Sequence, residues 1–135
     1  MKLSYDYLIN KHKGMPCVVS CHGPSLNQHK KQIEDLQRKK KIIRISMNEW
    51  YDFFEEKPDY WAVSNSEFTI EASMTHHPLW AHRGYPHDVF NLYDIPLLYN
   101  STADLSSDEY LDKLKCDYFA YDTRHFKGHN CRQIL

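Results

Sequence analysis

Residues 15–27 constrain the fold more than any other stretch, because a small apolar run, an abrupt turn and a helix start follow one another there. The run at positions 17–21 is typical of a first strand that is covered on both faces in the interior of a sheet. Gly23 can adopt backbone angles that other residues resist, and Pro24 fixes φ for a first helical turn. Ser25 or Asn27 is placed to cap the N–H groups that follow. Such a junction presents backbone N–H groups to an anionic ligand, although an ordinary strand-to-helix connection uses the same residue types.

The segments that follow alternate between strand and helix. The pattern predicts an amphipathic helix over 27–41, a strand over 42–47, a short helix over 49–56 and a strand over 60–63. Short connections between such elements call for right-handed crossovers and a parallel sheet. We therefore expect an α/β fold, a Rossmann-like three-layer domain with a mostly parallel central sheet that is incomplete at its C-terminus.

The chain of 135 residues suits a single domain. Residues 1–14 form a lead-in, residues 15–66 form a βαβαβ core with the ligand turn, and residues 67–135 form a less regular second part. In that second part the apolar residues predict strands over 88–93 and 116–121.

Polar residues follow each of the first three predicted strands. Gly23, Pro24 and Ser25 follow the first strand, Asn48 follows the second, and Asn65 with Ser66 follows the third. Parallel strands deliver their carboxyl ends to one edge of the sheet, where open α/β folds bind ligands. Each group taken alone is also an ordinary cap or turn residue. Their recurrence predicts that the side chains of Ser25, Asn48 and Asn65 converge on one crevice.

Composition excludes several classes of partner. The 17 basic and 18 acidic residues leave no field that would favour nucleic acid or an anionic membrane. The basic run 38–41 complements the C-terminus of a helix. No run is long enough to span a bilayer, the first residues lack the apolar core of a signal peptide, and the four cysteines form no CxxC pair. We therefore expect a cytoplasmic protein with reduced thiols and no membrane span.

A cluster of histidines at 76, 77, 82 and 87 invites a metal interpretation. Their spacing does not match a metal-binding motif, and no carboxylate or thiolate lies at a ligand interval. Surface or capping histidines are the simpler interpretation, so we expect neither a metal nor a cofactor.

Together these motifs resemble the amino-terminal half of bacterial sialyltransferase-like proteins. The resemblance rests on Val18-Val19, the turn Gly23-Pro24-Ser25-Leu26, Asn48 with the aromatic and acidic residues after it, Lys57-Pro58-Asp59-Tyr60, and Asn65-Ser66 with Phe68. It covers roughly the first 70 residues, and the wider group includes a domain of unknown function associated with flagellin glycosylation and a pterin diphosphokinase family.

The resemblance implies a metal-independent site for a cytidylate nucleotide. Gly23, Pro24, Ser25, Asn48, Asn65 and Ser66 would be its nucleotide contacts. His22 stands where the family's turn often has Asn. The family's second half supplies the tyrosines that steady the leaving phosphate and a histidine base, and nothing flanking His125 matches that motif.

Two functions follow from these observations. The first is a glycosyltransferase-like, nucleotide-sugar-binding domain without complete catalytic machinery, in which His125 beside Arg124 is the best substitute for the base. We expect no measurable glycosyl transfer by this chain alone. The second is a non-catalytic binding or assembly module of viral or mobile-element origin, in which a second copy or a partner chain completes the sheet.

Overall fold

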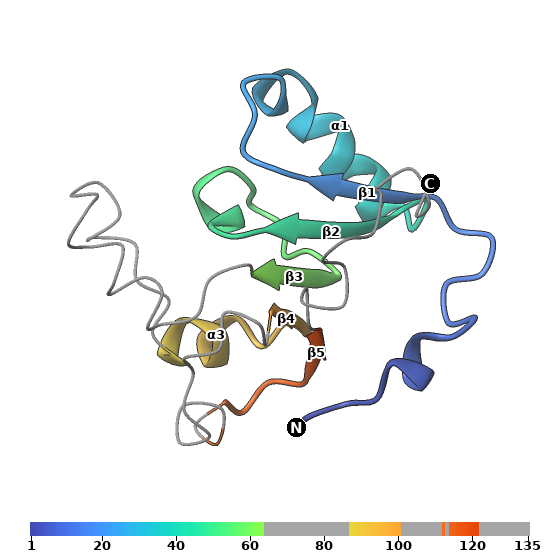
Figure 1. Ribbon diagram of the computed structural model, residues 1–135. Helices are drawn as coiled ribbons and strands as arrows, with labels where there is room; N and C mark the ends of the chain where they lie inside the picture. Colours follow the sequence, from blue (N-terminus) through green and yellow to red (C-terminus); the bar gives the residue numbers. More distant parts are fainter. Residues whose placement is uncertain (64–86, 101–111, 113, 122–135) are drawn as a thin grey trace, which may run out of the picture.

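The computed structural model describes residues 1–63, 87–100, 112 and 114–121, and within them five parallel strands form one sheet in the order β1-β2-β3-β4-β5 (Figure 1). The strands are β1 (Cys17–Ser20), β2 (Ile43–Met47), β3 (Tyr60–Val63), β4 (Leu97–Asn100) and β5 (Tyr118–Tyr121). The helices are α1 (Leu26–Arg38), α3 (His87–Tyr93) and the short 3₁₀ helices η1 (Tyr5–Leu8) and η2 (Trp50–Asp52). The predicted α/β class with a parallel sheet is confirmed.

The prediction that β1 lies in the interior of the sheet is wrong. Among the described strands β1 pairs only with β2, in a register that joins Cys17 to Ile43 and Ser20 to Ser46. Val19 is 56% exposed, as suits an edge strand. The small residues that indicated burial on both faces fit an edge strand equally well, because small side chains need little cover on either face.

The strand order explains where the helices lie. Each crossover steps in the same direction along the sheet, and right-handed crossovers that do so lie on one face. Residues of α1 and α3 accordingly belong to one apolar cluster: Leu26 begins α1, Phe90 lies in α3, and both share the cluster with Trp61 of β3. A doubly wound sheet reverses its order and opens a binding crevice at the reversal, whereas this order has no reversal among the described strands.

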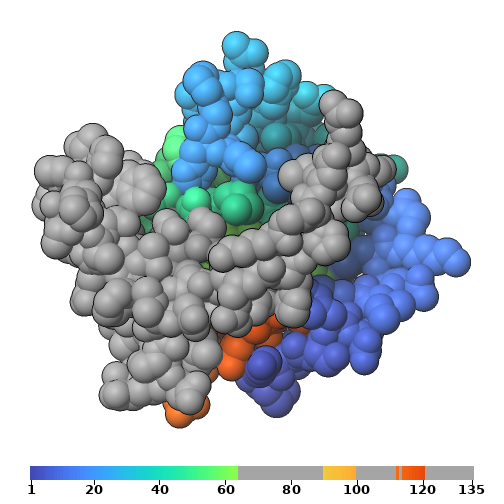
Figure 2. Space-filling model, viewed as in Figure 1, coloured from blue at the N-terminus to red at the C-terminus, as the bar shows by residue number. Residues whose placement is uncertain are grey.

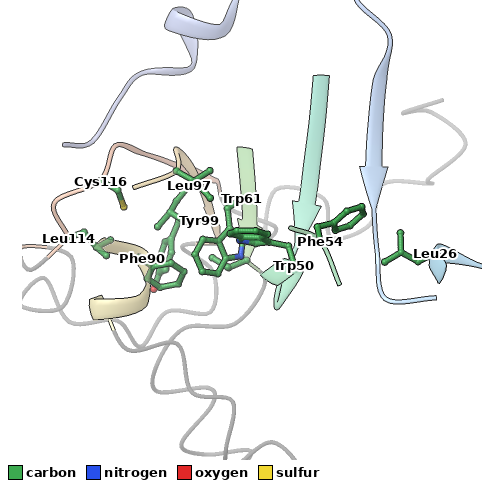
Figure 3. Packing of buried hydrophobic residues seen from close by; sticks show 11 residues of the cluster. Leu26, Trp50, Phe54, Trp61, Phe90, Leu97, Tyr99, Leu114 and Cys116 are labelled. Carbon is green, nitrogen blue, oxygen red and sulfur yellow. The ribbon is translucent and has the colours of Figure 1, made fainter. Parts of the chain in front are cut away.

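The core on this helix face is built around Trp61, which is fully buried (Figure 3). The rings of Trp50 and Phe90 meet its indole edge-on, with ring centroids 6.0 and 4.8 Å away. Leu97 and Tyr99 of β4 point to the same face, and Cys116 lies beside them. Edge-to-face packing of large aromatic rings fixes the position of η2 against the sheet.

The N-terminal segment covers part of the opposite face. Its backbone joins β5 through a hydrogen bond from Leu3 N–H to the Tyr118 carbonyl (2.8 Å) and one from Tyr118 N–H to the Met1 carbonyl (3.1 Å). Tyr5 and Tyr7 lie against Phe119, with ring centroids 5.7 and 6.3 Å away. In Figure 2 these residues (blue) lie against β5 (orange).

The helix predicted over 49–56 is reduced to the single turn η2. The reason lies in Glu34 of α1, whose buried carboxylate accepts hydrogen bonds from the backbone N–H groups of Glu55 (3.0 Å) and Glu56 (2.6 Å). These two donors are satisfied by a side chain instead of by helical carbonyls. The loop is thereby attached to α1.

The strand predicted over 88–93 is also wrong, since these residues form α3. Phe90 is buried and Tyr93 packs against the same cluster three residues later, which is the spacing of a helix face. Leu92 is 74% exposed, so the apolar character of this segment does not mark burial at every apolar position. Asp94, with φ of 50°, follows the helix before the chain enters β4.

Candidate functional site

The candidate site lies at the carboxyl edge of β1 and β2, toward which their arrowheads point in Figure 1. β1 ends at Ser20, and five residues lead from it to the start of α1 at Leu26. β2 ends at Met47, and Asn48 follows directly. The buried hydroxyls of Ser20 and Ser46 form a hydrogen bond of 2.6 Å across the two strands. This bond fixes the two strand ends relative to each other.

The turn after β1 is open to solvent. Residues 21–25 are all exposed. Gly23 does not adopt a positive φ, and a Cβ built there would meet only the Ser25 hydroxyl oxygen, 3.8 Å away. Gly23 therefore leaves its backbone accessible to a ligand, and the conformational reason predicted for it does not apply.

Ser25 does not cap α1, contrary to expectation. Its backbone is already helical (φ −63°, ψ −20°), and its side chain makes no capping hydrogen bond. The backbone closes the turn instead, since Leu26 N–H donates to the Gly23 carbonyl (3.0 Å). The first turn of α1 carries no acidic residue, so the positive end of the helix dipole is not neutralised from within the helix.

Asn48 adopts a left-handed conformation, with φ of 47°. Asn tolerates this region better than most residues do. Its N–H donates to the Ala62 carbonyl (2.9 Å), and its own carbonyl accepts from the Trp61 indole N–H (2.6 Å). Its side-chain oxygen Oδ1 is buried and meets no hydrogen-bond donor within the described residues.

His22 joins the two turns. Its Nε2 lies 3.0 Å from the Met47 carbonyl oxygen, and its Nδ1 lies 3.5 Å from a carboxylate oxygen of Glu49. Its ring packs on Phe53, with centroids 4.9 Å apart. Both ring nitrogens face oxygen acceptors, an arrangement that the doubly protonated ring satisfies on both sides. In that form His22 neutralises Glu49 beside the turn.

The sequence interpretation missed this histidine–glutamate pair. It noted His22 only as a departure from the family's Asn, and Glu49 only as the first residue of the helix predicted over 49–56. The available signal was position, because His22 comes directly before Gly23 and Glu49 directly after Asn48. Pairing them requires the register of β1 on β2.

A groove with a cavity volume of about 340 Å³ lies between α1 and the loop after η2. Lys30, Lys31 and Arg38 of α1 line it together with Glu34, Phe53, Glu55 and Glu56. Arg38 lies 3.6 Å from Glu56, and Lys39 lies 2.9 Å from Asp35. The start of the basic run at 38–41 therefore pairs locally with acidic residues. The groove begins at Phe53, next to His22.

The remaining predicted site residues, Asn65, Ser66 and His125, lie outside the described residues, as do the histidines at 76, 77 and 82. Ser25 and Asn48 lie on turns at the same edge that His22 connects. The predicted convergence with Asn65 stays a prediction. In the described part of the chain, no group of three or more His, Cys, Asp or Glu is arranged to hold a metal ion.

Comparison of the chain with protein-family models, with curated proteins and with solved structures finds no match. Among the described residues, no helix has the length and apolar character needed to cross a bilayer. The functional argument therefore rests on the geometry of the carboxyl edge.

Proposed function

We propose that this chain is a glycosyltransferase-like domain that binds a nucleotide or nucleotide sugar of the cytidylate type at the carboxyl edge of β1 and β2. One observation carries the proposal. The hydrogen bond from His22 to the Met47 carbonyl brings the turn 23–25 next to Asn48, and these are two of the motifs on which the resemblance to sialyltransferase-like proteins rests. A cytidylate site of the kind that the resemblance implies needs both the turn 23–25 and Asn48.

The phosphate would lie at the start of α1. This 13-residue helix offers N–H groups and the positive end of its dipole, with no acidic residue in its first turn. The Ser25 hydroxyl is free of a capping role and can donate to a phosphate oxygen.

The nucleoside would extend from this turn toward Asn48 and the groove that begins at Phe53. The buried Oδ1 of Asn48, which has no donor among the described residues, would accept a hydrogen bond from a hydroxyl or amino group of the ligand. A buried acceptor without a donor costs free energy, so a ligand that supplies the donor gains affinity from it.

We propose binding without turnover. Glycosyl transfer needs a base within about 3 Å of the acceptor hydroxyl and groups that stabilise the departing phosphate. The nitrogens of His22 are both directed at protein oxygens, so this histidine positions the turn and does not act as the base. The free thiols of Cys17, Cys21 and Cys116 fit the reducing conditions of the cytoplasm, which we propose as the location.

Isothermal titration with cytidine monophosphate tests the binding, with adenosine monophosphate and inorganic phosphate as comparisons. Ser25→Ala should weaken binding about 10-fold or more, because it removes a hydrogen bond to a charged group. Ser4→Ala is the matched control, since Ser4 caps η1 on the other side of the sheet.

Asn48→Gly removes the side-chain acceptor while keeping the left-handed backbone accessible. It should also weaken binding of cytidine monophosphate. Asn10→Gly is its matched control, because Asn10 has φ of 61° and lies in the N-terminal segment. If cytidine monophosphate does not bind at millimolar concentration, or binds all four variants equally, the proposed site is wrong. Release of the sugar from a cytidylate donor that His125→Ala abolishes would contradict the absence of turnover.

A second candidate function is assembly through the edge of β1. The Pro16 carbonyl accepts from Ile43 N–H (2.9 Å), so the backbone groups at alternate positions 16, 18 and 20 face β2. Those of Cys17, Val19 and Cys21 then face outward, and no charged residue protects this edge between positions 16 and 21. A second copy pairing antiparallel about Val19 would place Cys17 opposite Cys21 of the partner subunit.

Mild oxidation tests this second candidate. Directly opposite residues in an antiparallel pair lie about 4.5–5.5 Å apart at Cα, which is within disulfide range. A dimer linked between positions 17 and 21 supports assembly, and sedimentation should show Val19→Lys as a monomer. Leu92→Lys, at an exposed apolar position in α3, should leave the dimer intact. A wild-type chain that sediments as a monomer at high concentration refutes this candidate.

A further inference from the structure

The face of the sheet opposite α1 contains an apolar pocket of about 160 Å³. Ile43 and Ile45 of β2 form its floor with Leu98 of β4. Leu8 and Met15 of the N-terminal segment line it from above. This pocket lies on the other side of the sheet from the core that holds α1 and α3, and it shares no residue with the candidate nucleotide site.

The pocket exists because the N-terminal segment crosses the sheet as a strap, defined here as residues 1–16. One end of the strap is held at β5 by the hydrogen bonds of Met1 and Leu3 to Tyr118, and the other enters β1, where the Pro16 carbonyl bonds to Ile43 N–H. Figure 1 shows the strap passing from the N-terminus beside β5 to the start of β1. Between these fixed ends the strap stands away from β2 and leaves the space beneath it.

The polar groups of the wall are already satisfied. His12 Nε2 and the Tyr60 hydroxyl form a hydrogen bond of 2.5 Å, and their rings meet edge-on with centroids 5.5 Å apart. Partial burial, followed by the charge of Asp59, raises the pKa of the Cys17 thiol, which keeps this wall neutral at pH 7. A water molecule needs two to four polar partners, and the described part of this lining offers it almost none.

We propose that this pocket binds a small neutral ligand through a compact apolar group of about six to eight carbon atoms. The volume of the pocket sets the size of the apolar group, because an apolar cavity of about 150 Å³ admits a benzene-sized molecule. The lining determines that the group is apolar, because most of the described lining side chains are apolar, and His12 and Tyr60 form a hydrogen bond with each other. The ligand reaches the pocket beside Cys17, which is exposed while Met15 and His12 are half-buried.

Benzene is the probe for this proposal, and Cys17 is the reporter. Alkylation of the thiols is followed by peptide mass spectrometry, so that Cys17 and Cys21 are quantified in the same sample. Benzene should slow alkylation of Cys17 severalfold in a saturable manner, with half-saturation on the order of 1 mM or below. Cys21 is also exposed but does not line the pocket, so its rate should not change.

Ile45→Phe fills the pocket from the sheet and should abolish the protection of Cys17. Met15→Phe fills it from the half-buried strap and provides the same readout if the β2 variant does not fold. Leu92→Phe is the matched control on the far side of the sheet and should keep the protection. The proposal is overturned if benzene does not protect Cys17 saturably, or if it protects Cys17 equally in a folded variant whose pocket is filled.

Discussion

The buried thiol of Cys116 makes the stability of this protein fall at alkaline pH. Cys116 is 1% exposed and lies in the core cluster beside Leu97 and Tyr99. Burial raises its pKa from the ordinary 9.0 to about 11, a rise that the nearby N-terminal amino group opposes only partly. Between these two values the unfolded chain has released the thiol proton while the folded chain keeps it. The free energy of unfolding therefore declines as pH rises from about 9 toward 11.

The magnitude follows from the shift in pKa. Two pKa units at about 1.4 kcal/mol each correspond to about 3 kcal/mol, which is fully lost only above the folded-state pKa. At about pH 10.5 the expected loss is about 2 kcal/mol relative to neutral pH. Below the unfolded-state pKa the thiol is protonated in both states, so its titration does not change the free energy of unfolding near neutral pH.

Urea unfolding at about pH 7.5 and about pH 10.5, with reductant present, measures this loss. Cys116→Ala is the comparison, because it removes the thiol while the other groups that titrate in this range remain. The variant loses packing contacts of the sulfur, which lowers its stability by about the same amount at both pH values. Its free energy of unfolding should therefore decline by about 2 kcal/mol less than that of the wild type between the two pH values. Equal declines in the two proteins would refute the assignment to Cys116.

Two further predictions concern buried hydrogen bonds. Glu34→Ala should lower the free energy of unfolding in urea by about 2–4 kcal/mol, because two backbone N–H groups of the loop after η2 lose a charged acceptor. Asp35→Ala changes its half-buried neighbour, whose partner is the exposed Lys39; it should have little effect, and a comparable loss there would contradict the reasoning. Ser20→Ala and Ser46→Ala should each cost about 1–3 kcal/mol, while the double variant costs clearly less than their sum, since neither hydroxyl then remains unpaired. Additive losses would show that the two hydroxyls do not depend on each other.

The elements that the sequence predicted well are marked by their own composition and by the turn residues that flank them. Residues 42–47 and 60–63 are short apolar runs between turn signals, and they form β2 and β3 within one residue of the predicted bounds. Residues 27–41 carried a one-sided pattern among strong helix formers and form most of α1. In these cases local sequence and tertiary packing favour the same structure.

The errors occur where a long-range contact decides the local structure. The helix expected over 49–56 ends early because Glu34, distant in sequence, supplies the acceptors for its N–H groups. Residues 88–93 are mostly apolar and aromatic, as in a short strand, yet Phe90 packs against Trp61 and the segment forms a helix. No window of neighbouring residues contains either partner.

In the candidate site too, local sequence predicted some features, whereas others depend on long-range contacts. Turn chemistry placed Gly23, Ser25 and Asn48 at the ends of β1 and β2, where the structure has them. The pairing of His22 with Glu49 depends on which strands are neighbours, and the sequence does not encode that choice locally. The interior position of β1 was inferred from its small apolar residues, whereas a sheet that steps in one direction places that strand at the edge.

The strand order accounts for both the apolar pocket and the polar carboxyl edge. Because the crossovers through α1 and α3 lie on one face, the strap is what covers the other face among the described residues, and it leaves part of the apolar surface beneath it unfilled. The same order leaves the turn after β1 with β2 as its one described neighbour, so His22 bonds to the end of β2 and holds the turn there. The apolar pocket and the polar edge are therefore two consequences of one topology, and they lie on separate surfaces where each can be changed without altering the other.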